Sequence, residues 1–250
     1  MSVRVPAVRP RSAWQLSLYP TSGEAGGCYR PPRQAPRDWV PGRPGADPDR
    51  ARQEAARRAR AKVRRYCAHN GLTRLATLTY AGAGCHDPAE LRSHLGEFFR
   101  ALRSTVGGEP LPYVWVPEWH KTDHGLHAHF ALGRYVHKSM IRSTWGRGFV
   151  HVKLLSDLPV GSGVREAARA AAGYLSKYVS KTFDAPHLFG RHRYDLAQGF
   201  QPPVQRLTGA SAEELLDQAC AFMGSEPIQS WSSAEVEDWN RPPAVWFAWA

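Results

Sequence analysis

The sequence predicts an α+β domain built on a central antiparallel β-sheet that is flanked by helices. Short strand-like segments alternate with amphipathic helices through residues 46–200. Two of these strands are separated by a turn short enough for a β-hairpin, which favours antiparallel pairing. Hydrophobic residues make up 42% of the 250 residues, enough for a core of ordinary size.

The N-terminal part divides into an arm and a helix. Residues 1–45 are rich in proline, glycine and arginine and lack hydrophobic periodicity, so we expect a flexible basic arm. A helix should begin near Asp47 and end at Asn70–Gly71, because Asp is a favoured N-cap and Asn-Gly a strong stop signal. This helix is either a solvated surface helix or one that rests on DNA phosphates. Its candidate DNA-binding side chains are Arg57, Arg58, Arg64 and Arg65.

The next segments supply most of the sheet. Residues 72–82 (LTRLATLTYAG) are predicted to form a strand, and residues 87–108 a helix with leucine and phenylalanine at helical spacing and a Gly-Gly stop. Residues 112–119 (PYVWVPEW) and 126–132 (LHAHFAL) are the expected strands of a hairpin, joined by a turn containing KTDHG.

The rest of the chain adds helices, one more strand and a tail. Residues 137–145 are predicted to form a short helix, residues 148–155 a strand and residues 165–183 an alanine-rich helix. Residues 201–250 form an acidic C-terminal segment with a helix around Ala212–Met223. Its Trp- and Pro-rich end either docks a partner or folds back on the core.

Charge is distributed unevenly. Residues 1–200 hold 31 Lys and Arg against 15 Asp and Glu, whereas residues 201–250 hold 2 against 7. The basic portion suggests a polyanionic partner, most simply nucleic acid. No apolar run reaches the roughly 18 residues of a transmembrane helix, and no secretion signal is recognisable, so we expect no membrane association and a cytoplasmic location. The four cysteines form no CxxC pair, which indicates neither a zinc ribbon nor a disulfide framework.

One strand combines an apolar face with two imidazoles. Because side chains alternate along a strand, His127 and His129 point to one face while the intervening hydrophobic residues point to the other. If the hairpin loop has an even number of residues, Glu118 lies on the histidine face and completes an N,N,O set for a divalent cation such as Mg²⁺ or Mn²⁺. With an odd number, His120 or His124 becomes the better third ligand. Such a set also fits zinc or non-haem iron, so it does not define the reaction.

A second motif, GYLSKYVSK at residues 173–181, points to a reaction. At about 100° per residue, Tyr174, Lys177, Tyr178 and Lys181 fall on one arc of a helix, next to an apolar arc that would pack on the sheet. Aromatic rings at a core boundary with lysines at the rim would give the same pattern. However, the chain has 27 Arg and 6 Lys, and two of those lysines lie in this stripe. That choice favours a compact charge, for example at a scissile phosphate.

Together the two motifs predict phosphodiester chemistry. A metal held by His127, His129 and Glu118 would neutralise phosphate charge, and Tyr174 or Tyr178 would attack phosphorus to form a phosphotyrosine. Two tyrosines would allow two sequential strand transfers. Lys177 would lower a phenol pKa or stabilise the transition state. We expect Lys181 to contact DNA.

These residues resemble the HUH endonucleases, and specifically rolling-circle replication initiator (Rep) proteins with two tyrosines. LATLTY (75–80), GLHAHFAL (125–132) and YLSKYVSK (174–181) resemble the three family motifs in the expected order. The resemblance covers about residues 70–185. It implies a central antiparallel sheet with the tyrosine helix packed beside it, and metal-dependent nicking of single-stranded origin DNA. It further implies a 5′-phosphotyrosine link and a free 3′-hydroxyl for a polymerase.

Other functions are compatible with parts of this pattern. An HUH transposase or a relaxase shares the chemistry and differs in its DNA substrate. A non-catalytic origin DNA-binding protein would use the arginine helix and the N-terminal arm, and a facial-triad iron oxygenase would leave the tyrosine-lysine stripe without a role. The sequence has no GxxxxGK[ST] phosphate loop, so strand separation is expected to depend on a host helicase.

Overall fold

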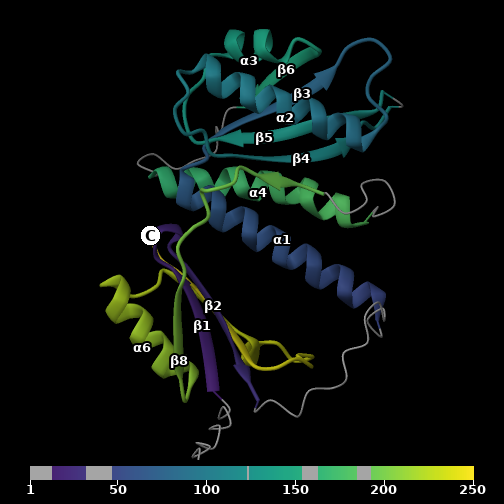
Figure 1. Cartoon of the computed structure of the whole chain (residues 1–250). Coiled ribbons are helices and arrows are strands. Elements are labelled where there is room, and N and C mark those ends of the chain that lie inside the picture. The colour runs from purple at the N-terminus through teal and green to yellow at the C-terminus, as the bar shows by residue number, and fades with distance from the viewer. Residues whose placement is uncertain (1–12, 32–46, 123, 154–162, 185–192) are drawn as a thin grey trace, which may run out of the picture. The chain divides into compact units, whose positions relative to one another are not determined.

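The computed structural model describes residues 13–31, 47–122, 124–153, 163–184 and 193–250, and these residues have the predicted α+β fold (Figure 1). They fall into two compact units. One lies within Ala46–Pro202 and the other within Met1–Gly45 and Pro203–Ala250. Each unit contains a five-stranded antiparallel sheet.

The unit within Ala46–Pro202 is built on a sheet with the strand order β6-β3-β5-β4-β7. The hairpin predicted from the sequence lies at its centre, where β5 pairs with both β4 and β3. The strands are β3 (Arg74–Tyr80), β4 (Tyr113–Trp119), β5 (Leu126–Leu132), β6 (Gly148–Lys153) and β7 (Asp195–Leu196).

Four described helices accompany this sheet: α1 (Pro48–Asn70), α2 (Pro88–Thr105), α3 (Lys138–Trp145) and α4 (Val164–Asp184). The ends of α1 follow from its capping residues. The Asp47 carboxylate accepts a hydrogen bond from the Arg50 amide at 2.9 Å, and Gly71 ends the helix with a left-handed φ of 59°. Both capping residues are at the positions predicted from the sequence.

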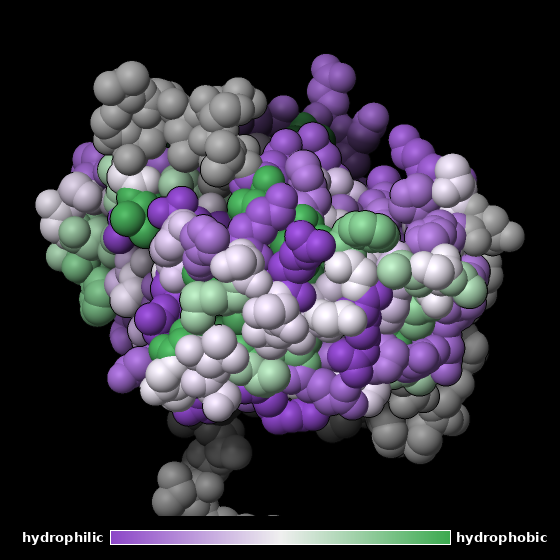
Figure 2. Space-filling view, turned by 90° about the horizontal axis from the view of Figure 1, so that it is seen from above, coloured by the Kyte–Doolittle hydropathy of each residue, from purple (hydrophilic) through white to green (hydrophobic). Residues whose placement is uncertain are grey.

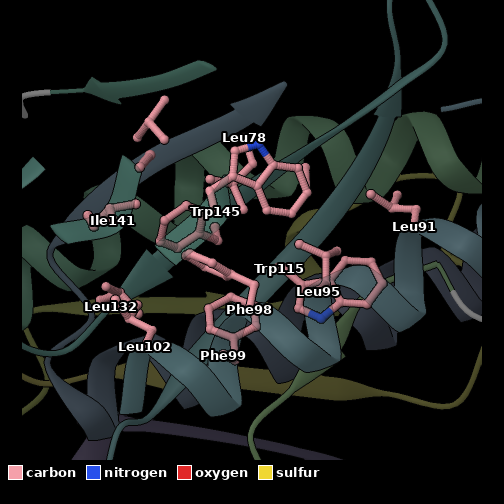
Figure 3. Close-up of a cluster of buried hydrophobic side chains, with 14 of the residues drawn as sticks. Leu78, Leu91, Leu95, Phe98, Phe99, Leu102, Trp115, Leu132, Ile141 and Trp145 are labelled. Atoms are coloured by element: carbon pink, nitrogen blue, oxygen red, sulfur yellow. The ribbon is translucent and has the colours of Figure 1, made fainter. Parts of the chain in front are cut away.

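The two faces of the sheet pack against different helices. Leu126, Ala128 and Phe130 of β5 join the cluster formed with α2 and α3, where Phe98 and Trp145 pack edge to face (Figure 3). The opposite face belongs to a second cluster with α1 and α4, and these two helices lie side by side (Figure 1). The alternating pattern of β5 therefore separates a purely hydrophobic face from the face that carries the histidines.

The unit within Met1–Gly45 and Pro203–Ala250 has the strand order β8-β1-β2-β10-β9. Leu16, Leu18 and Ala25 from its N-terminal strands and Phe247 from its last strand are buried together with side chains of the helix. Its elements are β1 (Ala13–Tyr19), η1 (Pro20–Ser22), β2 (Glu24–Arg30), β8 (Gln205–Gly209), α6 (Ala212–Met223), β9 (Gln229–Ser232), η2 (Ser233–Glu235) and β10 (Ala244–Ala248).

This sheet corrects the prediction of a flexible arm over residues 1–45. Residues 13–30 form a β-hairpin between β8 and β10, while residues 1–12 and 32–46 lie outside the described residues. The hairpin was missed because its partner strands lie about two hundred residues later in the chain, beyond the reach of local composition. The Trp- and Pro-rich tail supplies β9 and β10, and the buried Trp249 indole donates to the Ser225 carbonyl at 2.8 Å.

Surface properties agree with the sequence where they are described. No described helix has the length and apolar character needed to cross a bilayer. All four cysteines are free thiols, and Cys67 and Cys85 are buried. On the face seen in Figure 2, hydrophobic side chains are interspersed with hydrophilic ones.

Candidate metal and tyrosine site

The hairpin of β4 and β5 determines which side chains meet. Glu118 is directly opposite His127, and Val116 is opposite His129. The connection, residues 120–125, has an even number of residues, so the carboxylate lies on the histidine face. The alternative third ligands are engaged elsewhere: His124 Nε2 lies 3.0 Å from the Tyr80 carbonyl, and His120 Nδ1 lies 2.6 Å from Thr122 Oγ1.

A glycine shapes the end of this hairpin. Gly125 has a φ of 78°, and a Cβ added there would collide with the Cys85 carbonyl. The adjacent Leu126 amide donates to the same Cys85 carbonyl at 2.6 Å, and the His120 amide donates to the Gly125 carbonyl at 2.8 Å. These contacts stabilise the register that aligns Glu118 with His127.

Glu118, His127 and His129 form a group that can hold a metal ion, with ligand atoms within 4.8 Å of one another. Nε2 of each histidine lies 2.9 Å from Oε2 of Glu118. Neighbouring ligands of an octahedral ion with bonds of about 2.1 Å are separated by about 3 Å, so these donor atoms are close to a coordinating arrangement. The three side chains are only 6–14% exposed. Two imidazoles and one carboxylate are a donor set that divalent metals use.

The surroundings keep the site in a state suited to binding a cation. Burial acts to raise the pKa of Glu118, but hydrogen bonds from His127, His129 and Lys181 outweigh it and hold the pKa well below its usual range. Burial also lowers the pKa of His129, although its hydrogen bond to Glu118 acts in the opposite direction. The carboxylate is therefore ionised and the His129 ring neutral at neutral pH.

Thr77 on β3 orients one of the two imidazoles. It lies directly opposite His129, with its Oγ1 2.9 Å from His129 Nδ1. This contact leaves Nε2 facing Glu118, and such contacts behind a metal ligand usually determine its tautomer and orientation. Thr77 was not identified from the sequence. Its place in LATLTY, two residues before Thr79 on the same face, was the available signal.

Helix α4 brings the tyrosines to the histidines. Leu175 and Val179 are fully buried in the cluster that also contains Val114 and Val116 of β4. Tyr178, on the neighbouring part of the helix surface, stacks on His129 with ring centroids 3.6 Å apart and planes at 20°. The ring centroid of Tyr174 is 6.1 Å from that of His129.

The two phenols also contact each other. The Tyr178 hydroxyl donates to the Tyr174 hydroxyl at 2.9 Å. Burial raises the pKa of Tyr178 far above its ordinary value, and the Tyr174 contact and the negative charge of Glu118 act in the same direction. Tyr178 is therefore a neutral phenol in the metal-free protein.

The two lysines of the motif occupy different environments. Lys181 forms an ion pair with Oε1 of Glu118, and its Nζ lies 5.1 Å from the Tyr178 ring centroid. Lys177 is exposed on α4. The structure therefore brings Lys181, which we expected only to contact DNA, to the carboxylate, while the catalytic role predicted for Lys177 stays a prediction.

The predicted DNA-binding arginines lie along α1. Arg57 forms an ion pair with Glu54 at 3.2 Å, Arg58 is exposed, and Arg64 and Arg65 are half-buried. Arg65 Nε donates to the Ala61 carbonyl at 3.0 Å. A contact between α1 and α4, from Arg60 Nη1 to Ser180 Oγ at 3.0 Å, was not anticipated. The role of these arginines in DNA binding stays a prediction.

Comparison with known families adds an independent observation. Residues 73–183 match a family model of replication-associated proteins, the ORF2 type. The matched segment runs from β3 to the last turn of α4, so it contains the histidine strand, Glu118 and both tyrosines. The match supports the role of a replication initiator. Neither the curated proteins nor the solved structures contain a match to this chain.

Proposed function

We propose that this chain is a replication initiator of the HUH type, with two tyrosines, that nicks and rejoins single-stranded origin DNA of a plasmid or phage. The observation that carries the proposal is the stacking of Tyr178 on His129 at 3.6 Å, beside the Glu118 carboxylate. A nucleophile and a candidate metal site from distant parts of the sequence are thereby adjacent. The family match over residues 73–183 supports the same role.

The chemistry would be a transesterification at phosphorus. Glu118, His127 and His129 would hold Mg²⁺ or Mn²⁺, which would supply charge neutralisation at the phosphate. A phenolic oxygen of Tyr178 or Tyr174 forms a bond to phosphorus, and the bond from phosphorus to the 3′-oxygen breaks. The phenolic proton is lost, and the departing oxygen gains a proton as a 3′-hydroxyl. The product is a 5′-phosphotyrosine that keeps the energy of the broken bond for rejoining.

The phenol pair and the lysine have separate roles in this scheme. The hydroxyls of Tyr178 and Tyr174 are 2.9 Å apart, so a phosphate bound beside one is close to the other, as two successive strand transfers require. Lys181 lies between Glu118 and the Tyr178 ring and would stabilise negative charge on phosphate. Strand separation and synthesis would be supplied by a host helicase and a DNA polymerase.

The proposal is tested by covalent capture. A pool of single-stranded oligonucleotides of randomised sequence, labelled at the 3′ end, is incubated with the protein and Mn²⁺ and then boiled in detergent. Because the 5′-phosphate side stays on tyrosine, the 3′ label should migrate with the protein, while a 5′ label should appear in a shorter DNA that ends in a 3′-hydroxyl.

Variants identify the source of the adduct. The double change Tyr174→Phe and Tyr178→Phe should abolish the adduct and leave Mn²⁺ binding intact, whereas Tyr135→Phe should form it at the wild-type level. DNA binding without cleavage in Mg²⁺ or Mn²⁺ would instead favour a non-catalytic origin-binding protein. An adduct formed by the double variant would exclude α4 as the source of the nucleophile.

A further inference from the structure

The histidine face of the sheet continues beyond the metal candidates to the edge strand β6. Thr79 and Thr77 of β3 lie opposite His127 and His129 on one side, and opposite Phe149 and His151 on the other. Directly opposed residues of antiparallel strands share a face. Phe149 and His151 are therefore on the same face as the two histidines.

Phe149 is unusual in its exposure. It is 66% exposed, although its neighbour Val150 on the opposite face of β6 is buried in the hydrophobic cluster with α2 and α3. Among the described residues of this unit, Tyr135 is the other aromatic side chain with that exposure. A large apolar ring kept in solvent on a sheet face that carries a candidate site indicates a binding role.

The position of Phe149 fits a ligand that extends from the catalytic site. His127 and Phe149 are separated by two strand spacings, which is about 10 Å. This separation places the ring beside a nucleotide that neighbours the one being cut. The strand pairing of β3 keeps the direction fixed, because Thr79 is hydrogen-bonded into both neighbouring strands.

Positive charge lies along the same strand. Lys153, two residues beyond His151, has its Nζ 4.9 Å from the ring centroid of Tyr174. Lys153 is exposed and lies opposite Leu75 on the histidine face. An aromatic ring and a lysine on one strand, next to the phenols, match the combination that binds single-stranded nucleic acid: stacking for a base and charge for the backbone.

We propose that Phe149 stacks on a base of the single-stranded DNA that flanks the scissile phosphate, and that Lys153 contacts the backbone of the same strand. This inference rests on the proposed function and names the substrate contacts of that site. A single strand is the occupant because its bases offer free π-faces, whereas the base faces of a duplex are covered by their neighbours.

Binding measurements in EDTA test the inference without cleavage. Fluorescence anisotropy compares a labelled dT 12-mer with a 12-mer of the same backbone in which every nucleotide is abasic. Phe149→Ala should weaken binding of the dT 12-mer by roughly 5- to 150-fold, the effect of losing one stacked base. Its affinity for the abasic 12-mer should stay at the wild-type value.

Two control variants separate stacking from charge. Lys153→Met should weaken both oligonucleotides by the same factor and reduce the slope of log affinity against log salt by about 0.7. Tyr135→Ala, a change at an equally exposed ring, should leave both affinities unchanged. Thermal melting verifies that each variant is folded.

Failure of this inference is distinguishable from failure of the proposed function. If wild-type protein binds dT and forms the phosphotyrosine adduct but Phe149→Ala binds dT equally well, the stacking role is overturned alone. Equal losses on dT and abasic DNA would overturn it too, because the ring would then act without a base. Absence of both adduct and single-strand binding in the wild type would overturn the proposed function itself.

Discussion

Glu118 is the residue on which both the charge and the geometry of the site depend. One carboxylate oxygen accepts hydrogen bonds from two imidazoles, and the other forms the ion pair with Lys181. The side chain is 14% exposed, so these interactions are screened by little water. A change at this position should therefore affect metal binding and stability together.

The first prediction concerns metal affinity. Glu118→Gln keeps the side-chain shape but removes the negative charge and replaces one oxygen with an amide nitrogen. We expect the affinity for Mn²⁺, measured by isothermal titration calorimetry, to fall by at least about tenfold. Glu109→Gln, at an exposed position, should leave it unchanged. Equal affinities of wild type and Glu118→Gln would show that Mn²⁺ binds elsewhere.

The second prediction concerns pH. The pKa of Glu118 in the folded protein lies below the value of about 4.3 expected in the unfolded chain, so the unfolded state takes up the proton first as the pH falls. The stabilising contribution of Glu118 is thus fully present above about pH 4.3 and decreases below it. In EDTA, Glu118→Gln should lower the free energy of unfolding by about 1–3 kcal/mol at neutral pH and by less at about pH 3.5. A difference that does not change with pH would contradict this linkage.

At the scale of elements, α4 is the helix that positions the chemistry. Its buried side of Ala171, Ala172, Leu175 and Val179 fixes the rotation that turns Tyr178 toward His129. We expect Leu175→Ala to lower the free energy of unfolding by about 2–5 kcal/mol in a denaturant titration, because a fully buried side chain is replaced by a cavity.

A volume-conserving variant controls for this third prediction. Leu175→Met should cost less than about 1.5 kcal/mol, since it fills nearly the same space. If the two substitutions were equally mild, α4 would not be held by packing at this position, and the placement of the phenols would need another cause.

Local patterns were sufficient for most elements of the unit that carries the site. Asp47 and Gly71 gave the ends of α1, and the alternation in LHAHFAL gave the face on which the histidines lie. The even-numbered turn then placed Glu118 opposite His127, one of two arrangements left open by the sequence. These predictions succeeded because caps and strand periodicity depend on residues close together in the chain.

Other features depend on contacts between distant residues. The hairpin of β1 and β2 is stabilised by partners after residue 203, so its composition resembled that of a flexible arm. The spacing of YLSKYVSK placed both lysines on one arc, but whether Lys177 or Lys181 reaches Glu118 depends on how α4 rotates on the sheet. Thr77 was missed for the same reason, since its contact with His129 crosses two strands.

At the scale of the whole molecule, the chain separates the candidate chemistry from the second sheet. The metal candidates, both tyrosines and Phe149 all lie within Ala46–Pro202, together with the two hydrophobic clusters that support them. The acidic C-terminal segment contributes strands and α6 to the other unit. Nothing in the described site requires a side chain from that second unit.

The fourth prediction follows from this division. A fragment of residues 46–202 should unfold cooperatively and bind Mn²⁺ within about threefold of the full chain, because its cores are complete. Circular dichroism and calorimetry measure the two properties. A fragment that is unfolded under conditions in which the full chain is folded would show that the second unit stabilises the site.

The central claim is that a phenol of α4 attacks a phosphate held at the histidine strand. Its most direct measurement is mass spectrometry of the covalent adduct after nuclease and trypsin digestion. The account predicts a nucleotide attached through its 5′-phosphate to Tyr178 or Tyr174, within a peptide from residues 170–181. A nucleotide on a residue outside α4, or cleavage with no covalently modified peptide in wild-type protein, would contradict it.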